Sequence, residues 1–217
     1  MQRIYQGLKA RQRAERTGYP DNLGLRIHRA LSWLGRAEHE ADPDSRFIFL
    51  WIAFNAAYAT DIDDRLHLNE QASFNAFLEK LCDLDRSGRL ADLVWETYSS
   101  HIRVLLDNPY VFSCFWRYQR GQLTEEHWKH SFKAAKKAAN HSLAKQDTSA
   151  VLSIVFSRIY TLRNQIIHGG ATWNGSVNRE QIRDCVAILG DLVPRVIEVM
   201  MDNPGALWGE AGYPVVG

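Results

Sequence analysis

The chain has few cysteines, no excess of charge and no long apolar run, and each scarcity excludes a class of protein. Cys82, Cys114 and Cys185 are odd in number and widely spaced, without a Cys-x-x-Cys pair or histidines at zinc-finger spacing. This indicates neither a disulfide framework nor a structural zinc site, so we expect reduced thiols in the core. The net charge is only +1, so any contact with nucleic acid must be a local patch.

Long hydrophobic stretches are also missing. The longest, residues 47–59, is interrupted by Asn55 and is shorter than the roughly 20 apolar residues that span a bilayer. No apolar signal segment follows the positive charge near Met1. We therefore expect a soluble, cytoplasmic protein with no membrane contact. The content of 46% hydrophobic and 24% charged residues is ordinary for a folded domain.

Helical periodicity runs through the chain, and no alternating strand pattern bounded by hairpin turns is present. The expected fold class is therefore all-α, a helical bundle with a helical insertion in the middle of the chain. Residues 1–20, which hold five basic side chains and one acidic one, are expected to form a mobile or loosely docked basic arm. A single helical domain is expected over residues 21–201, with the insertion at about 62–145, followed by an irregular tail over 202–217.

Caps, breaks and apolar spacing give the expected helices. They cover about residues 21–40, 44–58, 70–84, 88–106, 124–145, 149–168 and 178–201. The residues expected to cap the N-termini of the last three of these helices are Thr124, Ser149 and Asn178. The aromatic segment from Tyr110 to Tyr118 lies between two of these helices, and its rings are expected to pack in a core.

The helix that opens at Thr124 carries lysines at four-residue spacing, Lys129, Lys133 and Lys137, which share one face. Such a ridge can contact the phosphates of a nucleic acid. The acids at the helix start and the lysines that follow also complement the helix macrodipole without any ligand. Both interpretations of the ridge stay open.

The most informative stretch is residues 163–168, with the sequence RNQIIH, which ends a long apolar helix directly before two glycines. Asn164 and His168 are four residues apart and so share a helical face, whereas Arg163 and His168 are about 140° apart on an ideal helix. Glycine adopts the left-handed conformation that ends helices, so the last turn can unwind. A freed His168 would reach Arg163 or a site shared with a second copy of the chain.

The aromatic-rich helix at residues 47–59, the later helix that ends in Arg163, Asn164 and His168, and one final helix together resemble the HEPN superfamily. The signature of that superfamily is an arginine, a polar residue and, four to six positions later, a histidine. Within the superfamily the chain is similar to the Apea-like group. The match covers the early helix pair and about residues 147–201. No recognised motif accounts for residues 62–145.

The resemblance implies a bundle that pairs as a homodimer, with two motif helices facing a shared cleft. It implies metal-independent endoribonuclease activity on RNA, with no cofactor, and use as a toxin or defence effector, sometimes beside a nucleotidyltransferase-type antitoxin. Some relatives cut no RNA and instead bind a nucleotide, RNA or a protein partner. That second function, a non-catalytic binding module, stays open.

RNA carries its own nucleophile, the 2′-hydroxyl, so the expected chemistry needs no metal. His168 would transfer a proton, Arg163 would neutralise charge on the phosphorane, and Asn164 would position His168 or the phosphate. The products would be a 2′,3′-cyclic phosphate and a 5′-hydroxyl. A purely structural role, in which these side chains cap helix ends, is the alternative.

A weaker rival is a metal site at the carboxylates Asp61, Asp63 and Asp64. The turn glycine and the distal glutamate of a calcium loop are both missing from this cluster. We therefore expect no metal.

Overall fold

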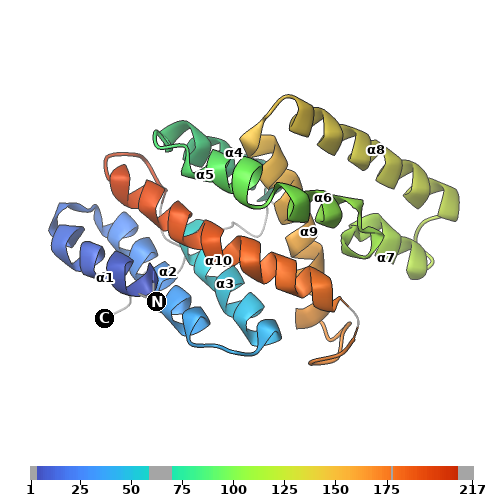
Figure 1. Ribbon diagram of the computed structural model, residues 1–217, viewed down its shortest axis with the longest axis horizontal. Coiled ribbons are helices and arrows are strands. Elements are labelled where there is room, and N and C mark those ends of the chain that lie inside the picture. Colours follow the sequence, from blue (N-terminus) through green and yellow to red (C-terminus); the bar gives the residue numbers. More distant parts are fainter. Residues whose placement is uncertain (1–3, 59–69, 177, 210–217) are drawn as a thin grey trace. The chain divides into compact units, whose positions relative to one another are not determined.

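The computed structural model describes residues 4–58, 70–176 and 178–209, and its helices are drawn in Figure 1. Every regular element in these three ranges is helical and none is a strand, so the all-α expectation is confirmed. No helix in this part of the chain is long and apolar enough to cross a bilayer. The described residues divide into two compact units, one within residues 1–89 and 186–217 and one within residues 90–185.

The first unit is built from four helices near the N-terminus and most of the last helix. They are α1 (Ile4–Glu15), α2 (Asp21–Glu38), α3 (Pro43–Tyr58), α4 (Glu70–Leu84) and α10 (Arg179–Asp202) from residue 186 onward, with the short helix η1 (Arg16–Gly18) after α1. α2 packs along α3 and along α1. The core of the unit is apolar, because residues such as Leu23, Ile27, Phe47 and Phe54 have no exposed surface.

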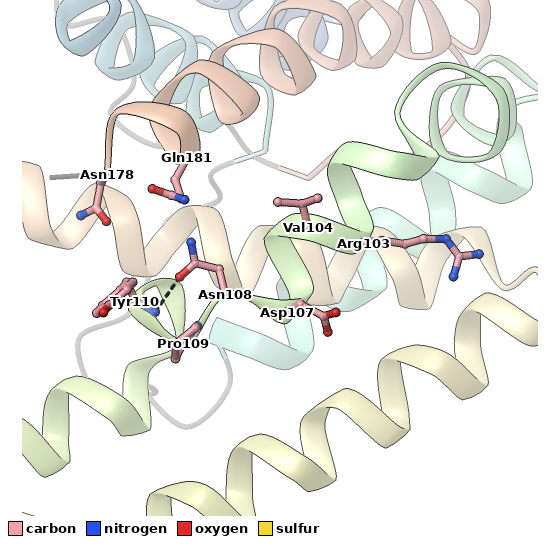
Figure 2. A pocket seen from close by; sticks show the side chains of 8 residues that line it. All are labelled: Arg103, Val104, Asp107, Asn108, Pro109, Tyr110, Asn178 and Gln181. Atoms are coloured by element: carbon pink, nitrogen blue, oxygen red, sulfur yellow. Dashed lines mark hydrogen bonds between the residues drawn. The ribbon is translucent and has the colours of Figure 1, made fainter. Parts of the chain in front are cut away.

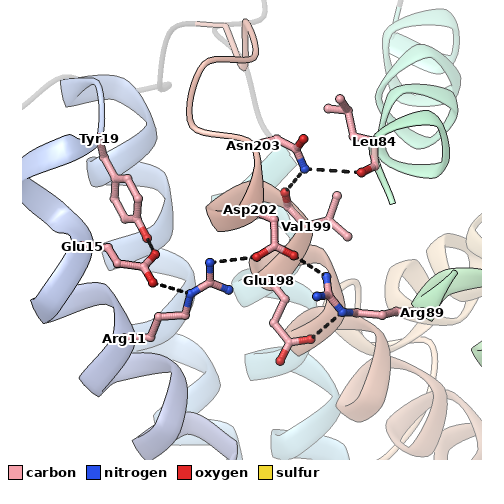
Figure 3. A network of polar contacts seen from close by, with 9 residues as sticks. All are labelled: Arg11, Glu15, Tyr19, Leu84, Arg89, Glu198, Val199, Asp202 and Asn203. Carbon is pink, nitrogen blue, oxygen red and sulfur yellow. Dashed lines mark hydrogen bonds and ion pairs between the residues drawn. The ribbon is translucent and has the colours of Figure 1, made fainter. Parts of the chain in front are cut away.

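Residues 4–15 are a docked helix rather than the mobile or loosely docked arm expected from their charge. The buried Leu8 and Gln12 lie on the same face of α1, one turn apart. Figure 3 shows how one of its basic side chains is compensated: Arg11 pairs with Glu15 at 2.8 Å and with Asp202 of α10 at 2.8 Å. The partner on α10 is remote in sequence, and this is why the charge count alone suggested a solvated arm.

Asp202 is the centre of this network. Its other carboxylate oxygen accepts from Arg89 at 2.6 Å, and Arg89 also lies 3.6 Å from Glu198. Burial alone would raise the pKa of Asp202, but the hydrogen bonds from Arg89 and Arg11 lower it below its ordinary value. The network therefore joins three segments of the first unit that are far apart in the sequence.

The second unit begins with α5 (Arg89–Asp92), which starts at the boundary, and a single π-helical turn, η3 (Leu93–Thr97). It continues through α6 (Ser99–Asp107), η4 (Pro109–Val111), α7 (Ser113–Gln119), α8 (Glu125–Ala144) and α9 (Thr148–Ile167), and includes the first turns of α10. The one helix expected over residues 88–106 is thus three elements. The predicted insertion at about 62–145 coincides with neither unit, because the second unit extends to residue 185 and includes the motif helix α9.

The aromatic segment packs mainly against α8. Phe115 lies edge-on to Trp128 with ring centroids 5.2 Å apart, Phe112 and Phe132 are also 5.2 Å apart, and Tyr118 stacks on Trp128. The expected ring packing is present, but these five rings are only half-buried. They form a small cluster beside α8 rather than part of the fully buried core.

Two of the three expected helix caps differ from the sequence interpretation. Thr124 caps α8 by accepting from the N–H of His127, as expected. Asp147, not Ser149, caps α9 and accepts from the N–H of Ala150 at 3.0 Å. Asn178 has a φ of 62° and its amide group donates to Gln165, so its side chain is drawn to another helix.

Candidate functional site at the end of helix α9

Helix α9 ends at a glycine in the left-handed conformation. Gly169 has a φ of 69°, its N–H donates to the carbonyl of Ile166, and the N–H of Gly170 donates to the carbonyl of Gln165 at 2.7 Å. This pair of bonds is a Schellman motif, which satisfies the last carbonyls of a helix. The N–H of His168 still donates to the carbonyl of Asn164 at 3.0 Å, so the last turn does not unwind.

Arg163 and Asn164 contact each other directly. The Nη1 of Arg163 donates to the Oδ1 of Asn164 at 2.9 Å, which fixes the two polar side chains as one unit. The Nε of Arg163 is enclosed and has no hydrogen-bond partner in the part of the chain that the structure describes. The Nε of the buried Arg158 has the same environment, so this feature does not distinguish Arg163 from a structural arginine.

His168 stands apart from that pair. It is exposed at the C-cap of α9, and its ring makes no hydrogen bond or ion pair with any described residue. The helical geometry explains the separation, since a regular last turn keeps Arg163 and His168 on different sides of the helix. The structure thus joins Arg163 to Asn164 and leaves the imidazole free to meet a ligand or a second chain.

Two apolar side chains share the helix face of Asn164. Tyr160 and Ile167, four residues before and three after it, are 43% and 46% exposed. Trp173, in the loop after the helix, is 74% exposed. Singly exposed apolar side chains are common on protein surfaces, so these three are a candidate contact surface only because the polar motif adjoins them in sequence.

Gln165 is the residue that sequence reasoning missed. Its Nε2 donates to the backbone carbonyl of Tyr110 at 2.7 Å, and its Oε1 accepts from the Nδ2 of Asn178 at 2.7 Å. One amide therefore joins α9 to η4 and to the start of α10. The sequence gives no signal for either contact, because both partners come from segments that no local pattern relates to α9.

Arg158 was also missed. It is only 3% exposed, its Nε has no hydrogen-bond partner among the described residues, and its guanidinium lies 4.5 Å from the centre of the Phe112 ring. Burial lowers the pKa of Arg158 to about 10. The ring face partly compensates the buried charge, so this arginine has a structural role.

The three lysines of the predicted ridge are exposed, but they are not equivalent. Lys129 pairs with Glu125 at 2.6 Å, and this carboxylate raises the pKa of the lysine. Lys133 and Lys137 make no ion pair with any described residue. The neighbouring Lys136, which is not one of the three ridge lysines, pairs with Asp107 at 2.9 Å.

The ridge and the motif are separate features of the second unit. The motif lies at the far end of α9, about 30 Å from the connection with α8 if each residue adds 1.5 Å. Figure 1 shows the two helices diverging from that connection. The ridge is therefore at most an accessory RNA contact.

No group of three or more His, Cys, Asp or Glu side chains that could hold a metal ion occurs within the described ranges. The carboxylates Asp61, Asp63 and Asp64 lie outside the described residues. Comparison with protein-family models, with curated proteins and with solved structures gives no match. Only the motif and its geometry therefore point to a function.

Proposed function

We propose that this protein is a metal-independent endoribonuclease of HEPN type that acts as a homodimer, as a toxin or defence effector. The observation that carries this proposal is the end of α9, where Arg163 and Asn164 are joined by a hydrogen bond and the exposed His168 follows one turn later. These are the residue types that RNA cleavage through the 2′-hydroxyl requires. The resemblance to the HEPN superfamily implies a nucleotidyltransferase-type antitoxin as a candidate partner.

In the proposed reaction the 2′-oxygen forms a bond to phosphorus while the bond from phosphorus to the 5′-oxygen breaks. One imidazole takes the proton of the 2′-hydroxyl and a second gives a proton to the leaving 5′-oxygen. Arg163 donates hydrogen bonds to the phosphorane oxygens, which carry more negative charge in the transition state than in the substrate. The products are a 2′,3′-cyclic phosphate and a 5′-hydroxyl.

The homodimer is implied by the HEPN resemblance, and it would supply the two imidazoles of the proposed reaction. Each chain supplies one His168, and the exposed Tyr160 and Ile167 offer an apolar surface around Asn164 for a second copy of α9. Pairing across a two-fold axis would bring the same patch together from both chains. Lys133 and Lys137 would contribute phosphate contacts away from the reaction.

The second candidate function is a non-catalytic module that binds a nucleotide, an RNA segment or a protein partner through the same surface. The observation that favours it is the exposed Trp173 beside a motif whose arginine is already bonded to Asn164. Aromatic side chains of this kind are frequent in binding surfaces. In this function Arg163→Ala weakens binding, and no variant cleaves RNA.

The test is incubation of labelled RNA with the purified protein in excess chelator, followed by end-group analysis of the fragments. We expect cyclic-phosphate ends from the wild type and a loss of at least about 100-fold in rate for His168→Ala, a typical size for the loss of an acid–base group. His141→Ala is the matched control, because His141 is also exposed at the end of a helix, α8. Equal cleavage by His168→Ala and wild type would exclude the proposed role of His168, and no cleavage by any folded variant would favour the binding module.

A further inference from the structure

The second unit contains a pocket of about 670 Å³ that no step of the proposed reaction uses. The end of α6, the turn η4 and the first turn of α10 form its walls, as Figure 2 shows. Three amide side chains, Asn108, Asn178 and Gln181, gather at one end with the ring of Tyr110. Arg103 lines the opposite end and its guanidinium points away from the amides.

The amide end has unused hydrogen-bonding groups of both kinds. Asn178 is only 7% exposed and its Nδ2 is bonded to Gln165, which leaves its Oδ1 without a described partner. Asn108 accepts from the N–H of Tyr110 with its Oδ1, which leaves its Nδ2. Gln181 makes no hydrogen bond with any described residue. Together the three amides offer donors and acceptors within one small region.

The walls beside these amides are apolar and open. Tyr110 is 51% exposed and Val104 is 58% exposed, and Pro109 also lines the pocket. An exposed ring and aliphatic surfaces suit the face of a flat ligand, while the amides suit a polar edge. Asp107, the one carboxylate that lines the pocket, is paired with Lys136, so its charge is compensated.

The pocket is mechanically connected to the motif. Gln165 directly follows Asn164 in the chain, and its amide holds both the carbonyl of Tyr110 and the side chain of Asn178. Trp116 donates to the same Tyr110 carbonyl at 2.6 Å, so this wall is fixed from two sides. The distance from the pocket to the motif is therefore set by hydrogen bonds rather than by a free loop.

We propose that this pocket binds one unpaired nucleobase of the RNA. The connection of this binding to cleavage rests on the proposed ribonuclease function. A nucleobase combines a flat face with an edge of donors and acceptors, which matches the ring and the three amides. The amides carry no charge, so the fit is to the base and not to the phosphate. Gln165 is a positioning residue that holds the base site at a fixed distance from Arg163.

The binding test uses the full chain and the four nucleoside 5′-monophosphates, with ribose 5-phosphate as the probe that has no base. We expect at least one nucleotide to bind and ribose 5-phosphate not to bind, by ligand-observed NMR and titration. Gln181→Ala should weaken the preferred nucleotide about tenfold, which is the effect of one lost hydrogen-bonded contact of about 1.4 kcal/mol. Gln119→Ala is the matched control, since Gln119 is an exposed glutamine on α7.

Tyr110→Leu gives a second variant in case Gln181→Ala does not fold, and it should also weaken binding because the stacking ring is lost. Equal binding of ribose 5-phosphate and the nucleotides, no binding at all, or normal affinity in both variants would overturn the base site. A cleavage arm separates this failure from failure of the ribonuclease proposal. RNA cut with the same base preference by wild type and Gln181→Ala would contradict only the pocket, whereas nucleotide binding without any RNA cleavage would contradict only the ribonuclease.

Discussion

The two units bury their side chains in different ways. In the first unit α2 and α3 enclose large apolar residues completely, Arg26 is buried and donates to the carbonyl of Ala57, and other charged residues meet in a network around Asp202. In the second unit the α7 and α8 rings are only half-buried, and Arg158 is buried without a carboxylate partner among the described residues. The first unit therefore draws on completely buried rings for its stability, whereas the second keeps its aromatic cluster partly exposed to solvent.

The largest expected effect tests the contrast between the two kinds of aromatic packing. Phe54 has no exposed surface and contacts Phe74 and Phe77 with centroids 6.0 and 6.2 Å away, so Phe54→Ala should lower the free energy of unfolding by about 3–5 kcal/mol. The half-buried Phe115 is the matched residue of the second unit, and Phe115→Ala should cost less than about 2 kcal/mol. Urea unfolding followed by circular dichroism measures both.

Equal losses in the two alanine variants would break the comparison between the units. Phe115→Leu serves as a control, because it keeps an apolar side chain and removes only the ring.

A smaller effect is expected at the charge network of the first unit. Asp202→Asn should lower the free energy of unfolding by about 1 kcal/mol, since the carboxylate is paired twice but is one-third exposed to solvent. The folded pKa of Asp202 lies below the ordinary 3.8, so its stabilising contribution is present above that value and is lost as the pH falls through the folded pKa. The difference in the free energy of unfolding between wild type and Asp202→Asn should therefore become smaller in acid.

Thermal unfolding at a series of pH values measures this difference. Asp83→Asn is a suitable control, because Asp83 is an exposed carboxylate on α4 in the same unit. A difference that grows as the pH falls would show that the ion pairs are not its cause.

The smallest expected effect concerns the lysines of α8 and assumes that RNA binds. Lys133→Ala and Lys137→Ala should each reduce the slope of log affinity against log salt by about 0.7, the value for one contact to a single-stranded phosphate. Lys129→Ala should change it less, because Glu125 already pairs with this lysine. Fluorescence anisotropy with labelled RNA at several salt concentrations gives the slopes.

If all three variants have the same slope, the ion pair at Lys129 does not matter for RNA. If none differs from wild type, the ridge is a solvated helix face and complements only the macrodipole of α8.

Local signals predicted the helices well. α3 and α9 were expected to within a few residues, because apolar spacing and the glycines after His168 act close to the helix ends, although the cap of α9 is Asp147 and not the predicted Ser149. The docking of α1 could not be predicted in the same way, since the partner of Arg11 is Asp202 at the other end of the chain.

The same distinction between local and long-range contacts applies to the candidate site. The sequence singled out Arg163, Asn164 and His168 and predicted that Asn164 would position His168 or the phosphate, whereas in the structure Asn164 accepts a hydrogen bond from Arg163. The bonds of Gln165 to Tyr110 and Asn178 depend on how three helices pack, so no pattern within one helix could indicate them. The pairing of Lys136 with Asp107 was missed for the same reason.

The division of the chain has a consequence for the order in which the protein folds during synthesis. The second unit is one continuous segment, residues 90–185, whereas the first needs residues from both ends of the chain. The fully buried core of the first unit includes Ile188, Leu189 and Leu192 of α10, so this core is incomplete until these residues have been synthesised. We therefore expect the second unit to reach its native structure first on the ribosome. The first unit cannot complete its core until the last helix has emerged.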